Sequence, residues 1–207
     1  FSPRIDTCQG ARTRILFVGY IRPEKGIEYL LEAVAQMKDE VPWELEIAGP
    51  SDFPAYRRKL DEIVAARNLH GRVRWRGYLA YGQPLFDRMR AADIFVLPTL
   101  SEGTPHVLVE ARASGLPCVS TTVGGVPSTV THGVDALLVP PKDPRALARA
   151  LKRIIHDGEL RRSLIRNGLV SARQQTLGRF TDKVLKELEV PFESGNSVVS
   201  PEYGPRA

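Results

Sequence analysis

Hydrophobic and polar positions follow two alternating periods along most of the chain. Short runs rich in apolar residues predict strands at residues 14–18, 44–48, 73–75, 94–97, 118–120 and 136–139. Between them, apolar residues at helical spacing predict helices at residues 27–37, 55–67, 85–91, 105–113 and 145–155. Each helix is long enough to form a right-handed crossover between parallel strands. The alternation therefore predicts a doubly wound, Rossmann-like α/β domain with one parallel sheet of about six strands.

The pattern changes after the last predicted strand. Residues 159–174 and 181–188 predict two further helices with no strand between them, which we expect to cover a sheet face or to reach another domain. Residues 1–13 resemble an interdomain linker. Residues 189–207 predict a C-terminal tail with too little apolar content to fold alone. The expected folded domain is therefore residues 14–188.

Composition narrows the choice of partner and compartment. The net charge of +5 favours an anionic partner, such as a phosphate-bearing ligand, nucleic acid or a membrane surface. The basic residues between 145 and 186 recur at helical spacing with few aromatic residues among them, so we expect no nucleic-acid partner.

Cys8 and Cys118 are far apart and lack metal-ligand spacing, which favours a reducing cytoplasmic setting. No apolar run approaches the roughly 20 residues that span a bilayer, so membrane contact is expected to be at most peripheral, at the inner face.

The loop after the first predicted strand carries glycine and two cationic residues. It runs from Gly19 to Gly26 and leads directly into the first predicted helix. In an open α/β sheet, ligands bind in the crevice beyond the carboxyl ends of the strands, where this loop is expected to lie. Gly19 permits close approach of a ligand to the backbone, and Arg22 and Lys25 supply cationic donors suited to a diphosphate. Because the spacing G-x-G-x-x-G is absent, a solvated turn is an equal alternative for this loop taken alone.

A second candidate loop follows the fourth predicted strand. Thr104 is a good N-cap and Pro105 suits the first helical position, so a helix is predicted to start here. The free backbone N–H groups of His106 and Val107, together with the positive end of the helix dipole, then form an anion site. This site faces the same crevice as Lys25. Two separate elements are thus predicted to converge on one phosphate position.

Two glutamates flank this predicted anion site. Glu110 lies roughly 7.5 Å beyond Pro105 at 1.5 Å per helical residue, which is the scale that separates a diphosphate from its ribose. A carboxylate there can accept hydrogen bonds from two vicinal hydroxyls. Glu102 precedes the helix on a flexible Glu-Gly corner and is predicted to bind hydroxyls of the attached sugar. The alternative is that Glu110 is a solvated helix residue and Glu102 a loop charge.

At these positions the chain resembles the C-terminal domain of the group 1, or family 4, retaining glycosyltransferases. The segments that carry the resemblance are residues 19–26, 92–130 and 137–151. They include the family's E-x7-E pair, at Glu102 and Glu110, and its phosphate-binding lysine, at Lys25. The resemblance implies the C-terminal half of a GT-B fold, in which two Rossmann-like domains close around a cleft.

The resemblance also implies how a UDP-, GDP- or ADP-sugar would bind. Glu110 would hold the ribose hydroxyls and Glu102 the hydroxyls of the donor sugar. The backbone near Tyr78 and Leu79 would hold the base. The distal phosphate and the sugar would meet the segment made of Gly103, Thr104, Pro105, His106 and Val107.

Glu102, Lys25 and Arg22 are the residues expected to take part in catalysis. Enzymes that the chain resembles generally need no bound metal, because the helix dipole and cations neutralise the leaving nucleoside diphosphate. We therefore expect no metal and no cofactor. The implied reaction is transfer of a hexose to an acceptor hydroxyl with retention of configuration, by attack on the face from which the phosphate leaves. The acceptor-binding N-terminal domain is missing from these 207 residues, so this chain alone is expected to bind nucleotide without transferring sugar.

The chain departs from the family pattern at two positions. The family commonly has arginine directly after the first-loop glycine, where this chain has Tyr20, and Arg22 follows two places later. It often has glutamate after Gly-Gly-x-Pro, where this chain has Ser128. Two alternatives to a transferase stay open, and the departures at Tyr20 and Ser128 bear on the second of them. One is a GT-B nucleotide-sugar epimerase or phosphorylase half, and the other is a non-catalytic binding domain of the same fold.

Overall fold

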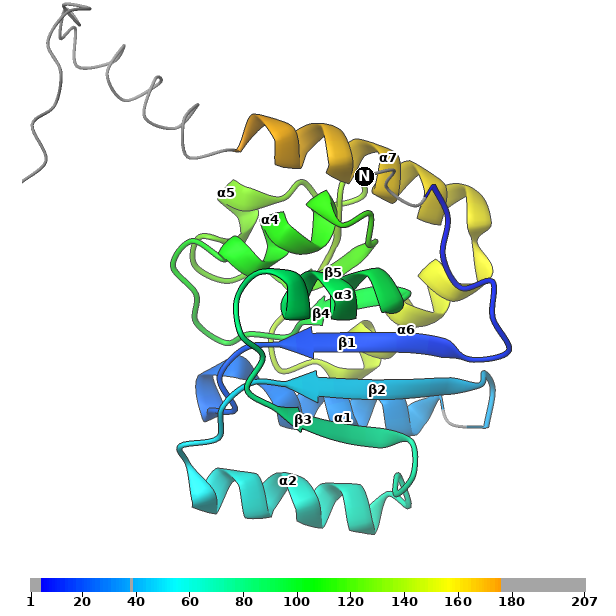
Figure 1. Ribbon diagram of the computed structural model, residues 1–207. Helices are drawn as coiled ribbons and strands as arrows, with labels where there is room; N and C mark the ends of the chain where they lie inside the picture. The colour runs from blue at the N-terminus through cyan, green and yellow to red at the C-terminus, as the bar shows by residue number, and fades with distance from the viewer. Residues whose placement is uncertain (1–4, 38, 176–207) are drawn as a thin grey trace, which may run out of the picture. The chain divides into compact units, whose positions relative to one another are not determined.

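A computed structural model describes residues 5–37 and 39–175, which form a six-stranded, all-parallel sheet between two layers of helices (Figure 1). The strand order is β3-β2-β1-β4-β5-β6. The strands are β1 (Thr13–Val18), β2 (Trp43–Ala48), β3 (Val73–Gly77), β4 (Ile94–Leu97), β5 (Cys118–Thr121) and β6 (Leu137–Val139). The doubly wound, Rossmann-like fold predicted from the sequence is thereby confirmed.

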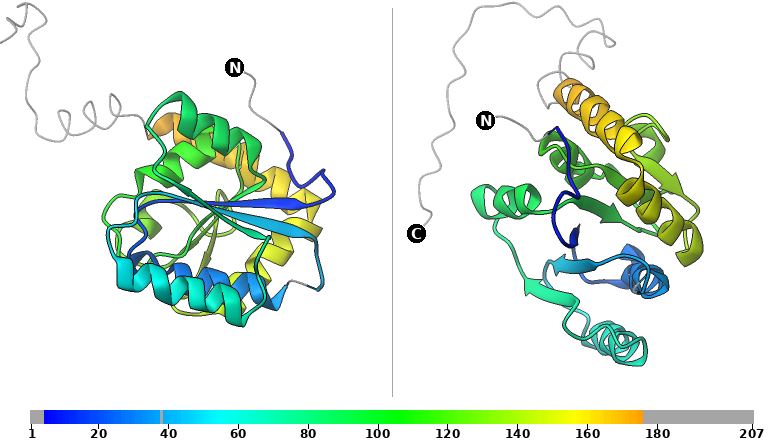
Figure 2. Two further views of the ribbon diagram at one scale, coloured as in Figure 1. Left: turned by 60° about the horizontal axis from the view of Figure 1, so that its bottom comes forward. Right: turned by 90° about the vertical axis from the view of Figure 1, so that its right-hand side faces the viewer.

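Helices cover both faces of the sheet (Figure 2). One face carries α1 (Ile27–Gln36), α2 (Pro54–Ala66) and α6 (Pro144–His156). The other carries α3 (Gln83–Ala91) and α4 (His106–Ala113), and α7 (Gly158–Gln174) packs against α4. This division follows from right-handed crossovers, because the chain moves toward β3 first and then returns across β1 toward β6. The central strands β4 and β5 are buried along their whole length, as expected for parallel strands covered on both faces.

The ends of the observed elements agree with the sequence predictions to within two residues. Two short elements were missed, the 3-10 helix η1 (Pro23–Lys25) and the helix α5 (Val126–Thr129), because each is too short to show a period. The predicted helix 181–188 and the predicted tail 189–207 lie outside the described residues. Within the described residues, no helix combines the length and apolar character needed to cross a membrane.

The part of the predicted linker that is described packs closely on the domain. Residues 5–12 form neither helix nor strand, yet Thr7 is buried. Asp6 accepts a hydrogen bond from the buried Arg161 of α7 at 2.6 Å. The carboxylate of Asp93, just before β4, accepts from the guanidinium of Arg14 at 3.0 Å and from the backbone N–H of Cys8 at 3.3 Å. Burial alone would raise the pKa of Asp93, but these hydrogen bonds hold it below its ordinary value.

Candidate functional site

The strand order reverses at β1, whose neighbours β2 and β4 continue the chain in opposite directions. In doubly wound sheets, ligands bind beyond the carboxyl ends of the strands at this switch point. The loops that follow β1 and β4 both leave this edge of the sheet, on the side of the arrowheads in Figure 1. They contain Lys25 and Glu102. The fold therefore places the two predicted phosphate and sugar loops side by side.

Backbone hydrogen bonds join these two loops. The carbonyl oxygen of Glu24, in η1, accepts from the N–H of Leu100 at 2.7 Å and from the hydroxyl of Thr99 at 3.1 Å. Gly26 follows η1 in a left-handed conformation with φ of 63°, and a Cβ atom there would lie 2.2 Å from the carbonyl oxygen of Pro98. Only glycine permits this approach, so the position of Lys25 is set by the backbone on both sides of it.

The side chains of Lys25 and Glu102 form an ion pair. The Lys25 ammonium donates to the Glu102 carboxylate with an Nζ to Oε2 distance of 2.7 Å. Their side chains are 19% and 16% exposed, so both charges are largely covered but still open to the edge of the sheet. Two residues that are 77 positions apart in sequence, and that were predicted to share a site, are thus in direct contact.

Glu102 is itself fixed by the loop after β5, which the sequence interpretation left without a role. The backbone N–H of Gly125 donates to the carbonyl oxygen of Glu102 at 3.0 Å. A Cβ atom on Gly124 would lie 2.0 Å from that same oxygen, and one on Gly125 would lie 1.9 Å from the carbonyl oxygen of Gly103. The Gly-Gly pair was the signal for this contact in the sequence, because adjacent glycines often mark a close approach of two backbones.

The start of α4 differs from the prediction. The helix begins at His106, with Pro105 rather than Thr104 in the N-cap position, and no side chain caps it. The N–H of His106 was predicted to be free. It donates instead to the carbonyl oxygen of Thr104 at 2.9 Å. Within residues 5–37 and 39–175, the backbone N–H groups of Gly103, Thr104 and Val107 make no hydrogen bond. These three groups are therefore the donors that this helix end offers to an anion.

Glu110 lies on the next turn of α4 and is half-buried. Its carboxylate forms no ion pair within the described part of the chain. Burial raises its pKa above the usual 4.5, and the charge of His106 only partly offsets this effect. A half-buried carboxylate that no ion pair in the described part of the chain neutralises has the chemistry to accept hydrogen bonds from hydroxyl groups.

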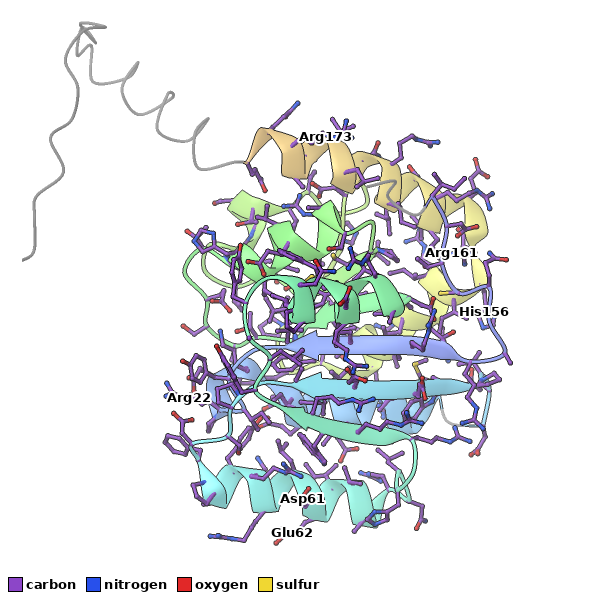
Figure 3. All side chains as sticks on the ribbon, in the orientation of Figure 1. Arg22, Asp61, Glu62, His156, Arg161 and Arg173 are labelled. Carbon is purple, nitrogen blue, oxygen red and sulfur yellow. The ribbon has the colours of Figure 1, made fainter. Side chains whose placement is uncertain are left out.

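Arg22 is already paired in this structure. Its Nε donates to Oδ1 of Asp52 at 3.0 Å, and its Nη2 contacts the other carboxylate oxygen of the same residue. The guanidinium also lies 4.8 Å from the centre of the Tyr20 ring. Figure 3 shows Arg22 toward the edge where the strands end, and Arg161 and His156 toward the other edge, where the strands begin. Asp52 was not foreseen as its partner, because the two residues lie on different loops.

Three more predicted residues lie along this edge. The N–H of Gly19 donates to the carbonyl oxygen of Ala48 at 3.0 Å, and that of Gly49 donates to Gly77 at 2.7 Å, so strand pairing continues into the loops. Directly after β3, Tyr78 is exposed and Leu79 packs partly against the core. The backbone at these two positions therefore lies on the same side of the sheet as the Lys25 loop.

The cavities found elsewhere have a different lining. One, of about 210 Å³, lies on the sheet face beside α3 and is lined by residues that include Arg14, Glu46, Arg76 and Arg88. Another, of about 510 Å³, lies between α1 and the end of α2. None of the predicted site residues lines either cavity. The arginines of the first cavity face carboxylates, as in the contact of 2.8 Å between Arg76 and Glu46, so their charge is largely neutralised.

The chain matches a family model described as "Glycosyl transferases group 1" over residues 12–157. An uncharacterized glycosyltransferase of Methanocaldococcus jannaschii is 32% identical over 153 residues, which cover 74% of this chain and 38% of that protein. The chain thus spans about two fifths of the length of that relative.

Solved structures agree with this match. HepE of Anabaena, in complex with UDP and glucose, superposes with a TM-score of 0.79 over 86% of this chain and 48% of that one. At 23% identity this likeness shows the fold alone. The C-terminal domain of the group 1 glycosyl transferase LpcC from Francisella tularensis is 25% identical, with a TM-score of 0.72, and the match covers 79% of this chain and 85% of that domain.

Proposed function

Because this chain belongs to the glycosyl transferases group 1 family, we propose that it is the donor-binding domain of a retaining enzyme that transfers a hexose from a nucleotide-diphosphate sugar to an acceptor hydroxyl. The observation that carries this proposal is the direct contact between Lys25 and Glu102 at the switch point of the sheet, with Glu102 next in sequence to the backbone N–H donors around the start of α4. In this proposal the cation, the carboxylate and the helix N-terminal donors act together on one bound pyrophosphate and its sugar.

Each group has a distinct task in the proposed site. The Lys25 ammonium and the N–H groups of Gly103, Thr104 and Val107 neutralise the pyrophosphate, whose charge grows as the glycosidic bond breaks. These donors stabilise the leaving group without a bound metal. Glu102 accepts from sugar hydroxyls, and Glu110 accepts from the ribose hydroxyls. Attack by the acceptor on the face from which the phosphate leaves then retains the configuration.

The proposal also covers the base of the nucleotide and the acceptor. The base lies against the backbone at Tyr78 and Leu79, at the edge where β3 ends. The complex of HepE with UDP and glucose supports a nucleotide-sugar donor. Since the chain spans under half of its relative from Methanocaldococcus, the acceptor is bound by an N-terminal domain of the whole enzyme. This chain alone therefore binds nucleotide without transferring sugar.

Titration calorimetry with UDP, GDP and ADP tests the proposed site. Glu110→Ala should weaken the affinity for the nucleotide that binds by about tenfold or more, because a carboxylate that accepts from two hydroxyls contributes charge-assisted hydrogen bonds. Glu62→Ala is a matched control and should leave the affinity unchanged. Glu62 is exposed on α2 (Figure 3), which covers the other face of the sheet from α4. Absence of heat with all three nucleotides and also with the corresponding nucleotide sugars would show a domain that kept the fold and lost the ligand.

The pH dependence of binding gives a second prediction. Because burial raises the pKa of Glu110 above 4.5, its carboxylate gains a proton at a higher pH than an ordinary glutamate and then loses acceptor capacity. The affinity for a nucleotide sugar should therefore fall as the pH is lowered from 7.5 toward 5. A nucleotide sugar suits this titration, because its two phosphates have no proton to gain in that range. In Glu110→Gln this fall should be absent, and an equal fall in that variant would assign the titration to another group.

A further inference from the structure

The contact between Lys25 and Glu102 joins two opposite charges within the candidate site. The ammonium that is proposed to neutralise the pyrophosphate already has a carboxylate partner at 2.7 Å. The backbones of both residues are fixed, at Lys25 by the bonds that Glu24 receives from Thr99 and Leu100, and at Glu102 by the Gly125 N–H. The pair is therefore held by the fold. It is not a chance meeting of two long surface side chains.

Binding a pyrophosphate changes the balance of charge at this pair. Glu102 is the carboxylate that neutralises Lys25 in the described part of the chain, since the Glu24 side chain is exposed and forms no ion pair there. A phosphate that approaches Lys25 meets the negative charge of Glu102 at close range. Repulsion at this distance weakens binding unless the carboxylate gains other hydrogen-bond donors. Sugar hydroxyls attached to the distal phosphate are such donors.

We propose that Glu102 is a built-in counter-ion of Lys25, which makes the site select a nucleotide that carries a sugar over the free nucleoside diphosphate. This inference rests on the proposed function, because it assigns a selective role to the same site. A donor replaces both halves of the ion pair, with phosphate for Lys25 and sugar hydroxyls for Glu102. A spent nucleoside diphosphate replaces only one half and leaves Glu102 facing the phosphate. The pair therefore favours donor entry and product release.

The test is the variant Glu102→Gln in this chain, titrated with UDP, GDP and ADP and with UDP-glucose, GDP-mannose and ADP-glucose. Glutamine keeps the shape of the side chain but removes the negative charge that neutralises the Lys25 ammonium. Affinity for the nucleoside diphosphate that binds should rise about threefold to tenfold, since a free cation forms a stronger contact with phosphate than one already paired. Affinity for the matching nucleotide sugar should not rise, because the acceptor for its hydroxyls is weakened. The preference for the sugar-bearing ligand should thus fall.

Glu24→Gln is the matched control. It removes the same charge from the residue next to Lys25 but leaves the contact between Lys25 and Glu102 in place. It should change the affinity for nucleoside diphosphate less than twofold, as expected for a screened surface charge. Equal tightening in both variants would overturn the inference, because a general loss of negative charge would then explain it.

The remaining outcomes separate the two proposals. Nucleoside diphosphate binding that is unchanged or weaker in Glu102→Gln overturns the counter-ion role and leaves the donor site in place. Absence of binding by the wild type and by every variant, with all six ligands, overturns both. Binding of nucleoside diphosphate that becomes measurable only in Glu102→Gln supports the inference most strongly.

Discussion

Replacing Arg112 by methionine should lower the free energy of unfolding by about 3–5 kcal/mol, because it leaves a buried carboxylate without its counter-charge. Arg112 is fully buried on α4, and its guanidinium contacts the Asp135 carboxylate at 2.6 Å, the side-chain oxygen of Gln175 at 2.6 Å and the carbonyl oxygen of Leu108 at 3.2 Å. The loss should appear in urea denaturation as a lower midpoint with an unchanged slope.

A second substitution tests this explanation. Asp135→Asn in the Arg112→Met background removes the unpaired charge and keeps an oxygen to accept from the Thr131 N–H, so it should recover more than half of the lost stability. Arg166→Met, at an exposed position of α7, is the matched control and should change the unfolding free energy by less than about 0.5 kcal/mol. A double variant no more stable than Arg112→Met alone would mean that packing, rather than charge, accounts for the loss.

The position of Arg112 connects stability to the proposed site. Gly168 of α7 packs on the stem of Arg112 so closely that an added Cβ atom would lie 3.2 Å from its Cγ. The same helix α4 carries Glu110 and begins beside the anion donors. The buried pair and this close packing therefore hold α4, and with it the half-buried Glu110, in a fixed position on the sheet.

The sequence predicted the elements of the fold well, because their periods and lengths are local properties. Strand 94–97 is an uninterrupted apolar run, and the helical period at 145–155 is strong. By contrast, the place of Arg112 could not be predicted. Arginine on a helix is ordinarily solvated, and its partner Asp135 lies 23 positions later. A buried ion pair of this kind depends on tertiary packing that a single sequence does not reveal.

The sequence predicted which residues lie together at this edge better than it predicted where α4 begins. Lys25 and Glu102 were assigned to one site because parallel strands end at the same edge of a sheet, and the structure brings them into contact. Their roles stay predictions. The start of α4 was placed one residue early, since threonine is a favoured N-cap in general. Here the backbone at Gly103 is packed against Gly125, and this tertiary contact outweighs the local preference.

The close packing of loops suggests where the site is most sensitive. Gly124→Ala should lower the unfolding free energy by about 2–4 kcal/mol, from backbone strain at a φ of 49° and from overlap with the carbonyl oxygen of Glu102 at 2.0 Å. It should also weaken nucleotide binding by at least about a hundredfold, because relief of the overlap moves Glu102 and the neighbouring donors together. Calorimetry below the unfolding transition measures the second effect separately from the first.

Gly133→Ala separates strain from overlap. Gly133 has a similar left-handed conformation, with φ of 74°, but an added Cβ atom there would meet no atom within 4 Å. It should therefore lose about 1–2 kcal/mol from the backbone alone and keep its affinity for nucleotide. If Gly124→Ala bound nucleotide as tightly as Gly133→Ala, the loop after β5 would not position the donor site. A loss confined to Gly124→Ala would instead assign the Gly-Gly pair the task of holding the segment of Glu102 and its neighbouring backbone donors in place, since the two substitutions differ chiefly in the overlap with that segment.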